Sequence, residues 1–513
     1  MISRLALPSV LLFRRLASPA FRNQSLRLKL PERKSWSTQT HASTSAIATC
    51  KVQATADFEL KNTTPSFATA ATTLGPTHNE KSEARFTVGL LFFLALLFFF
   101  YHGPYRAIRL SQPRDFALIY AEARCWMKGN NPYDEAELSK EFLTQANGPR
   151  ALVPEKRSHP SVYPPTVLPL LAAFAWLPWA NANLLWCLVS TSLFAISLLL
   201  TFRATGLSTK HNWLLASALI VFSPTHTGIA MGNPSVLVCS LIAVAIYLAL
   251  AEHVVISGIL LGIAHCFKPQ LTICALAVFV TWKCWLPALI SLVVPLVAVV
   301  ASVVRASSLG QYWQWCAMLR QNIIGSFGVE AVNDPGAGHQ SSYVLLNTQT
   351  VVGLFTRNVR LDDAIAWIIA GAMVLVYFRL RTRTPGDVRW RDLGFFSAIT
   401  IISAYHRYYD AQILLLLVPF LLKNWHLHRA IVISLCACLL LIAFPSQSGL
   451  ALWLGSGNPS SLSGVILFRH QPLAVLAIGL LLIPWTATRT RRQNTRNPIR
   501  LAITGKHQQQ NAA

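Results

Sequence analysis

Three short polar segments in an otherwise apolar chain carry side chains that could do chemistry. The first is a helix-like stretch with Asp115, Glu122 and Arg124 that ends at Gly129, where Gly followed by Asn-Pro-Tyr signals a stop and a turn. A carboxylate beside apolar residues at a membrane face can serve as a general base. The alternative is an amphipathic interfacial helix whose charges are solvated.

The second segment is a single lysine, Lys268, which follows an apolar run and precedes Pro269. An ammonium group at the bilayer surface suits a lipid phosphate. A lysine at the end of a helix can also simply extend its amine to water, and this alternative stays open.

The third segment, Tyr-His-Arg-Tyr-Tyr-Asp at 405–410, lies between two apolar runs. Aromatic side chains and one cation would serve as ordinary interfacial anchors. Ionisable groups near hydrocarbon are costly and tend to be functional, so the added His406 and Asp410 favour function and anchoring about equally.

The elements that must position these residues are membrane helices. Of 513 residues, 53% are hydrophobic and 12% are charged, whereas soluble proteins carry about 25% charged residues. Continuous runs of about 18 or more apolar residues can each cross a hydrocarbon core about 30 Å thick. Backbone groups in lipid must bond internally, so we predict an all-α integral membrane protein.

The formal net charge of +24 also has to be explained, since basic proteins often bind nucleic acid. The basic residues lie mainly at the chain ends and in short loops, where they orient helices and meet anionic headgroups. We therefore expect membrane lipids as partners and no nucleic acid.

Residues 1–84 differ in kind from the rest. They are rich in Ser, Thr, Ala and Arg, with five arginines before the first acidic residue, Glu32. This composition resembles an organellar transit peptide, while a disordered cytoplasmic tail and an over-extended gene start remain alternatives. We predict a targeting-like or disordered segment and assign no function to it.

About twelve apolar runs are candidate spans, and a further stretch, 164–179, is broken by four prolines. The runs cover about 86–103, 183–202, 212–224, 234–251, 254–267, 270–282, 285–304, 364–380, 392–404, 409–423, 428–445 and 471–487. Basic residues at the C-terminus and in the loops 379–391 and 423–429 favour the cytoplasmic side. Both ends inside require an even number of spans, so we predict that 164–179 is interfacial or re-entrant on the outer side.

This topology predicts a polytopic domain at 85–488 and a basic cytoplasmic tail at 489–513. The large first loop, 104–182, and the mid-chain loop, 305–363, then lie on the outer side. Lys268 and the segment 405–410 fall on that side as well. Four polar features on one face predict a site at the outer membrane boundary.

The order of the motifs resembles a known family. The motifs are RDFALIYAEARCWMKGNNPYD and VYPPTVLPLL in the first loop, MGNPS with a Gly-rich helix ending in Lys-Pro, and HRYYDAQILLLLVPFLL. Together, over roughly residues 85–425, they are similar to glycosyltransferase family 87, membrane mannosyltransferases of GT-C type that use polyprenyl-phosphate sugar donors. The chain departs from the family pattern at Asn233, where Gln is usual, and in an extra residue between His406 and Asp410.

The resemblance implies a GT-C type helical bundle and an inverting displacement. Asp115 occupies the position of the catalytic base, which would take a proton from an acceptor hydroxyl as that hydroxyl attacks the anomeric carbon. Cationic groups must then offset the growing charge of the leaving polyprenyl phosphate. Lys268 is the first candidate for this role, followed by His406 and Arg407.

We expect further side chains of these motifs to contact substrate. The predicted substrate-binding residues are Arg114, Tyr120, Glu122, Arg124, Tyr133, Tyr163, Asn233, Lys268, His406, Arg407, Tyr409 and Asp410.

The partners implied by the resemblance are a polyprenyl-phosphate sugar and a lipid or glycan acceptor. A lysine or arginine clamp can hold the leaving phosphate, so neither a cofactor nor a metal is demanded. The resemblance places the chain in a bacterial plasma membrane, and the transit-like N-terminus leaves an organellar membrane as the alternative.

Two other functions remain open. A multi-pass transporter or lipid flippase would place ionisable residues within its spans and often shows repeated halves. The charges here concentrate in the outer loops, which favours chemistry at the interface. A non-catalytic assembly factor is the third reading, and an intact Asp115 argues against it.

Overall fold

The computed structural model describes residues 78–110, 114–144, 161–205, 209–327, 331, 333–336, 340–356, 358–381, 387–425, 428–444, 447, 450 and 462–483. The chain divides into two units, Met1–Thr73 and Leu74–Ala513, and every described residue belongs to the second. Residues 1–77 of the predicted N-terminal segment and the whole predicted tail 489–513 lie outside the described residues.

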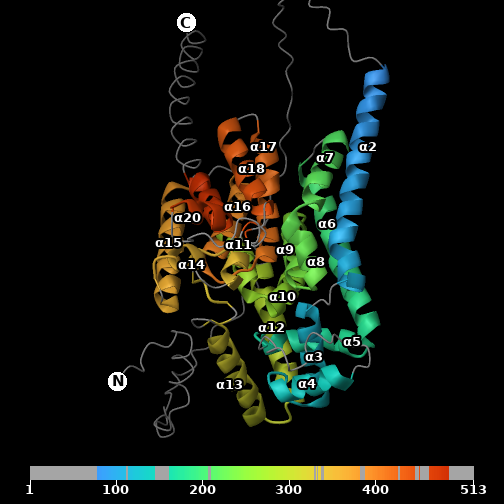
Figure 1. Cartoon of the computed structure of the whole chain (residues 1–513), viewed down its shortest axis with the longest axis vertical. Coiled ribbons are helices and arrows are strands. Elements are labelled where there is room, and N and C mark those ends of the chain that lie inside the picture. The colour runs from blue at the N-terminus through green and yellow to red at the C-terminus, as the bar shows by residue number, and fades with distance from the viewer. Residues whose placement is uncertain are drawn as a thin grey trace, which may run out of the picture. The chain divides into compact units, whose positions relative to one another are not determined.

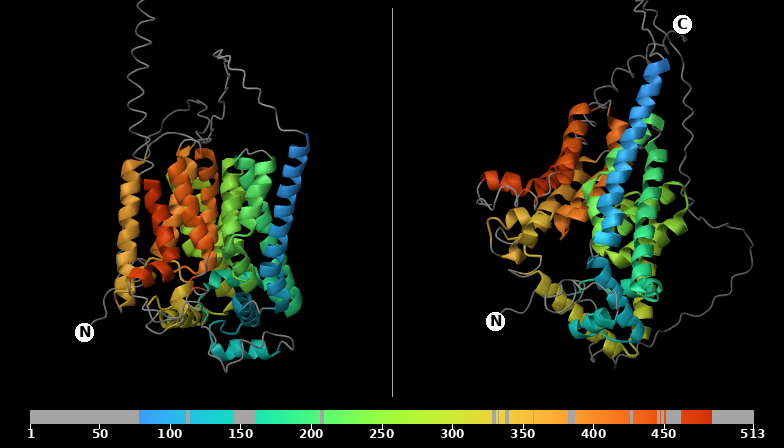
Figure 2. Two further views of the ribbon diagram at one scale, coloured as in Figure 1. Left: turned by 45° about the horizontal axis from the view of Figure 1, so that its top comes forward. Right: turned by 45° about the vertical axis from the view of Figure 1, so that its right-hand side comes forward.

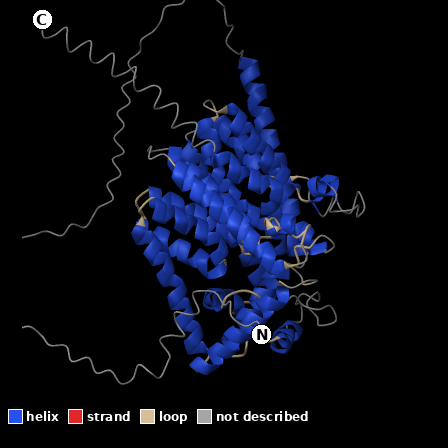
Figure 3. Cartoon of the chain, turned by 90° about the vertical axis from the view of Figure 1, so that its left-hand side faces the viewer, coloured by secondary structure: helices blue, strands red, loops and turns tan. Residues whose placement is uncertain are grey.

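The described part of the chain is helical and contains no strand (Figure 3). Four helical stretches are long and apolar enough to cross a membrane: Phe86–Arg109, Trp179–Ala204, Trp285–Arg305 and Val359–Leu380. A fifth span results if the pair His211–Ile220 and Ser223–Met231, bent by 48°, is counted as one. Membrane helices are therefore found as predicted, while the number of about twelve spans stays a prediction.

The first half of the bundle runs from α2 to α12. Its helices are α2 (His78–Phe100), η2 (Tyr101–Leu110), α3 (Arg114–Lys128), α4 (Glu135–Thr144), η4 (Pro165–Val167), α5 (Leu168–Ala175), α6 (Trp179–Thr205), α7 (Thr209–Ile220), α8 (Ser223–Met231), α9 (Ser235–Leu250), α10 (Val254–Phe267), α11 (Pro269–Thr281) and α12 (Trp285–Arg305).

The second half runs from α13 to the last described helix. It comprises α13 (Leu309–Ser326), η5 (Gln340–Val344), α14 (Gln349–Val352), α15 (Val359–Leu380), α16 (Asp387–Ser403), η6 (Tyr408–Leu417), α17 (Val418–Asn424), α18 (Arg429–Ala443), α20 (Leu462–Phe468) and an apolar helix at His470–Ile483.

Helices from the two large predicted loops gather at one end of the bundle. Figures 1 and 2 show α3, α4, α5 and α13 below the long helices that stand side by side. Contacts join the two loops directly: Gln311 donates to the Gly129 carbonyl at 3.1 Å, and Asn322 donates to the Tyr133 carbonyl at 3.2 Å. The loops 104–182 and 305–363 therefore form one assembly.

The proline-broken stretch 164–179 forms only η4 and α5 before α6 begins. The helical part, Pro165–Ala175, is roughly 16 Å long at 1.5 Å per residue, about half of a 30 Å hydrocarbon core. It packs against α3 beneath the bundle. A straight crossing by this segment alone is therefore ruled out by its length.

Three breaks between helices bring polar backbone and side chains together. Pro234 lies between α8 and α9, and Pro269 follows Lys268 between α10 and α11. Each proline favours a break, because it restricts the preceding residue to extended conformations. The third break, between α16 and η6, holds the segment 405–407. At membrane depth, such breaks are tolerated where protein buries them, and they often mark binding sites.

The helix α10 is pressed closely against α12 through two glycines one turn apart. A methyl group on Gly258 would lie 2.6 Å from Cβ of Ile290, and one on Gly262 would lie 2.6 Å from Cβ of Val294. Small residues at this spacing let helix backbones approach closely in membranes. This contact fixes the end of α10, where Lys268 follows.

Candidate functional site

Asp115 lies in the first turn of α3 and faces the break between α8 and α9. Its Oδ2 accepts a hydrogen bond of 2.6 Å from Nδ2 of Asn233. Gly232, in the left-handed conformation at φ 65°, ends α8 and turns the chain toward this contact. Asn233 is itself fixed, because its Oδ1 accepts the Ser235 backbone N–H at 2.9 Å at the start of α9.

Ser235 connects this contact to a buried ion pair. Its hydroxyl donates to Oδ1 of Asp410 and accepts a 2.7 Å hydrogen bond from Nζ of Lys268. Lys268 Nζ also lies 2.8 Å from Oδ1 of Asp410, and both side chains are at most 8% exposed. The ring centroid of Tyr409 is 5.1 Å from the same ammonium, a cation–π distance.

Asp410 is held from its other side by the segment between α16 and η6. Its Oδ2 accepts the Arg407 backbone N–H at 3.1 Å and lies 3.2 Å from Nδ1 of His406. The extra residue in this motif therefore does not prevent the His–Asp contact. His406 is fully buried, and its Nε2 has no hydrogen-bond partner among the described residues.

Arg407 is anchored by two side chains rather than by a carboxylate. Its Nε donates to the Tyr405 hydroxyl at 2.5 Å, and its Nη2 donates to Oδ1 of Asn333 at 2.9 Å. Burial lowers the pKa of Arg407, but the nearby Tyr409, Tyr405 and Asp115 outweigh it and raise that pKa above its usual value. Arg407 therefore carries a fixed positive charge within electrostatic range of Asp115.

The charges of two carboxylates, Asp115 and Asp410, balance those of two cations, Lys268 and Arg407. Asp410 offsets Lys268 through a direct contact, and Asp115 offsets Arg407 at longer range. If Asp115 takes up a proton, one uncompensated positive charge remains. A group that gains negative charge beside Asp115 would then be stabilised without movement of any side chain.

The remaining predicted residues are placed elsewhere or lie at the edge. Tyr120 donates a 2.7 Å hydrogen bond to the Leu177 carbonyl, and Arg124 pairs with Glu141 at 3.1 Å. Neither has a described contact with Asp115. Burial raises the pKa of Tyr163, and so do the charges of Asp115 and Glu122, so Tyr163 lies within electrostatic range of both. The Arg114 side chain lies outside the described residues.

Two residues of the network were not identified from the sequence. Ser235 contacts Asn233, Lys268 and Asp410, yet a serine two positions after a motif asparagine carries little signal alone. Asn333 belongs to the mid-chain loop, and only folding brings it into contact with Arg407. The backbone of that loop reaches the site as well, because Leu346 N donates to the His406 carbonyl at 2.9 Å.

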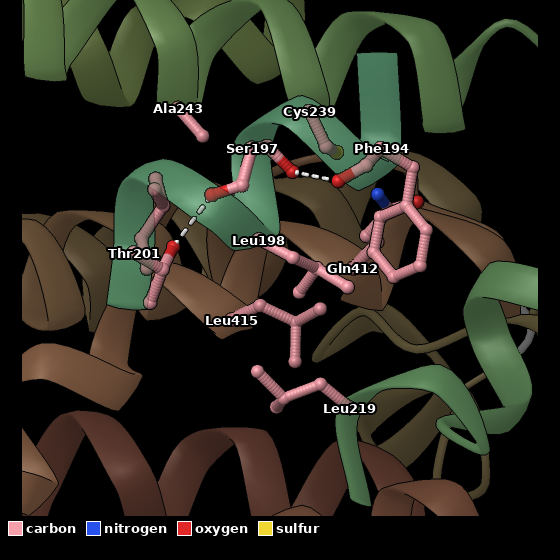
Figure 4. Close-up of a pocket in the computed structure, with 10 residues that line it drawn as sticks. Phe194, Ser197, Leu198, Thr201, Leu219, Cys239, Ala243, Gln412 and Leu415 are labelled. Atoms are coloured by element: carbon pink, nitrogen blue, oxygen red, sulfur yellow. Dashed lines mark hydrogen bonds between the residues drawn. The ribbon is translucent and has the colours of Figure 1, made fainter. Parts of the chain in front are cut away.

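Two hollows lie near these helices. A cavity of about 20 Å³ between α6, α7, α9 and η6 is lined by Ser197, Thr201 and Gln412, among others (Figure 4). It has room for about one water molecule, so it cannot hold a sugar. A hollow of about 350 Å³ is lined by Arg124, Lys128 and Trp176 at the far end of α3. Within the described residues, no cluster of three His, Cys, Asp or Glu side chains could hold a metal ion.

Comparison with known proteins gives one result. Residues 162–403 match the model of glycosyltransferase family 87. The resemblance seen in the motifs is confirmed, and the match indicates a glycosyltransferase with a sugar donor and an acceptor. The matched part contains Asn233 and Lys268, while Asp115 and the segment 405–410 flank it. No curated protein and no solved structure matches the chain.

Proposed function

We propose that this glycosyltransferase transfers a hexose from a polyprenyl-phosphate donor to a lipid or glycan acceptor, with inversion and with Asp115 as general base. Mannose is the expected sugar because of the family resemblance. We further propose a multi-pass protein of about twelve spans in a bacterial plasma membrane, with the site at the outer face. No metal or other cofactor has a part in this proposal.

The observation that carries the proposal is the junction between Asp115 and a buried network that contains cations. Asp115 is only partly buried, and no described group donates to its Oδ1. Lys268, by contrast, is buried, with 6% of its surface exposed. A chain of hydrogen bonds through Ser235 and Asn233 connects it to Asp115. A base open to a substrate beside fixed positive charge is what glycosyl transfer from a phosphate requires.

In the proposed reaction, Asp115 removes the proton of the acceptor hydroxyl as its oxygen attacks the anomeric carbon. The bond between that carbon and the phosphate oxygen breaks, and polyprenyl phosphate leaves with the electron pair. The donor phosphodiester carries one negative charge, and the released phosphate carries two. When Asp115 is protonated, it no longer offsets the charge of Arg407. The site therefore gains positive charge as the phosphate gains negative charge.

The test compares wild type with Asp115→Asn in membranes supplied with polyprenyl-phospho-mannose that is labelled in the sugar. Asn keeps the size of Asp but cannot accept the proton, so we expect label loss from the donor to fall by about 100-fold or more. Glu137→Gln is the matched control, because this carboxylate lies on α4 and contacts Asn130 and Lys140. The control should retain wild-type turnover.

Equal turnover by wild type and Asp115→Asn would refute the base while leaving a transferase. A folded wild type that turns over none of several donors and acceptors would favour the transporter or flippase. The buried Lys268–Asp410 pair is the observation that keeps this alternative, since transporters also use intramembrane ion pairs.

A further inference from the structure

Glu122 is a buried carboxyl group that the proposed reaction does not use. It follows Asp115 by seven residues on α3, so it projects from the same face about 10.5 Å further along the axis. Its side chain is 0% exposed, and neither carboxyl oxygen has a hydrogen bond of normal geometry in the described part of the chain. Burial raises its pKa well above the usual value, against the opposing effect of the Ser161 hydroxyl, and so favours the neutral, protonated form.

Three further polar groups near Glu122 have no hydrogen bond of normal geometry among the described residues. They are the Ser161 hydroxyl, the Tyr133 hydroxyl and the indole N–H of Trp126. Burial, and after it the charge of Glu122 in its ionised form, raise the pKa of Tyr133, so the two groups are within electrostatic range. Trp126 packs against the same cluster as Tyr133. We call these four side chains the Glu122 cluster.

The Glu122 cluster is costly unless something binds there. Each unpartnered buried polar group costs about 1–3 kcal/mol, and native proteins leave few of them. By contrast Glu141, an equally buried carboxylate 19 residues later, is paired with both Arg124 and Lys128. The chain can therefore satisfy a buried acid in this region, but it leaves Glu122 unpaired.

The chemistry of the cluster suits neutral hydroxyl groups. A protonated carboxyl and two hydroxyls can each donate and accept, and the indole donates. None of the four carries a positive charge, so the cluster offers a phosphate no charge compensation. The cations lie instead at Lys268 and Arg407, in the buried network described above. Tyr163 is within electrostatic range of Asp115, Glu122 and Arg407.

We propose that Glu122, Tyr133, Ser161 and Trp126 form a subsite for the hydroxyl groups of a sugar or polyol, which holds the acceptor two helical turns from Asp115. The term acceptor rests on the proposed function, whereas the binding of a polyol does not. The donor phosphate and the acceptor hydroxyls are then bound by different sets of side chains.

The test measures the Tm of detergent-purified protein with and without methyl α-mannoside, methyl α-glucoside, methyl α-galactoside or myo-inositol as probes. A bound probe raises the Tm of wild type in proportion to occupancy. Glu122→Met removes an unsatisfied carboxyl group at similar volume. We expect its Tm to equal or exceed that of wild type without probe, and we expect the probe shift to disappear.

Two variants make the result decisive. Glu141→Met is the matched control, since it removes the carboxylate that pairs with Arg124 and Lys128 and should lower the Tm while the probe shift remains. Ser161→Ala is a second, smaller change to the cluster and should also reduce the shift. The proposal is overturned if wild type responds to none of the probes, if Glu122→Met melts below wild type, or if either cluster variant keeps the full shift.

Failure of this proposal can be told apart from failure of the proposed function. If Asp115→Asn abolishes donor turnover but the cluster variants keep the probe shift, the transferase stands and the subsite is wrong. If the cluster binds polyols but no donor is consumed, the subsite stands and the transferase is wrong. In an active enzyme, Glu122→Met should raise KM for the acceptor at least tenfold and leave KM for the donor within twofold.

Discussion

At the scale of single residues, Asp410 is the centre of the site. Its two oxygens contact Ser235, Lys268, His406 and the Arg407 backbone, so it ties together three separate helix breaks. A buried carboxylate with several donors and one cation is stable, whereas the same carboxylate without the cation is not. Lys268 therefore has an observed role, as the partner of Asp410, and a proposed role, as a charge for substrate, and the two can be tested separately.

Lys268→Met should lower both stability and turnover. The variant leaves Asp410 buried without its cation, which costs about 3–5 kcal/mol. Adding Asp410→Asn removes the unpaired charge and should restore most of the Tm, while turnover of the labelled donor stays low because the phosphate still lacks its cation. Tm and turnover are measured on the same samples.

Lys283→Met serves as the control for this pair, because Lys283 is exposed in the turn between α11 and α12. Its effect on stability should lie within about 0.5 kcal/mol. Recovery of turnover together with Tm in the double variant would mean that Lys268 acts only as a structural partner of Asp410.

At the scale of elements, the site depends on how helices end. Gly232 closes α8 at φ 65°, a conformation that costs other residues about 1–2 kcal/mol. We expect Gly232→Ala to lower both the Tm and donor turnover, because Asn233 and Asp115 would be displaced. Gly232→Asn should be milder, since Asn adopts the left-handed conformation more readily. Equal losses in both variants would show that the backbone conformation is not the cause.

The packing of α10 on α12 gives a second prediction at this scale. Gly258→Ala places a methyl group 2.9 Å from the Pro287 carbonyl and against Ile290, so the helices must separate. We expect a loss of about 1–3 kcal/mol, seen as a lower Tm. Gly371→Ala on α15 is the control, because nothing lies within 4 Å of its added methyl group. A control that falls as far as Gly258→Ala would refute the packing argument.

Which short polar segments come together was easier to predict from the sequence than the residues at which the helices begin and end. Asp410 was chosen because ionisable groups near hydrocarbon are costly unless used. Lys268 was chosen because an ammonium group suits a lipid phosphate. Asp115 and Asn233 came from the family resemblance. The bend between α7 and α8 could not be foreseen, because one apolar stretch of 212–224 reads as continuous. The contact of Asn333 with Arg407 joins distant segments, and the Glu122 cluster joins α3 to residues further along the same loop, neither of which periodicity encodes.

At the scale of the whole bundle, successive helices carry the chain between two ends. The helix α9 leaves the site at Ser235 and ends about 24 Å away, and α10 returns from His253 to Lys268. The loops with α3 and α13 lie at the site end, where Arg305 at the end of α12 donates to the Trp126 carbonyl at 2.9 Å. The proposed outer location of the site therefore requires the turn at His253 to face the cytoplasm.

This orientation is tested with a membrane-impermeant maleimide on intact cells and on opened membranes. Trp313→Cys lies on α13 at the site end with 62% of the native side chain exposed, and His253→Cys lies in the exposed turn between α9 and α10. We expect Trp313→Cys to label above the wild-type background in intact cells, and His253→Cys only after the membranes are opened. The reverse pattern would place Asp115 and its network at the cytoplasmic face. The sugar donor would then have to be supplied from the cytoplasm, and the basic loops 379–391 and 423–429 would contradict the preference for positive charge inside.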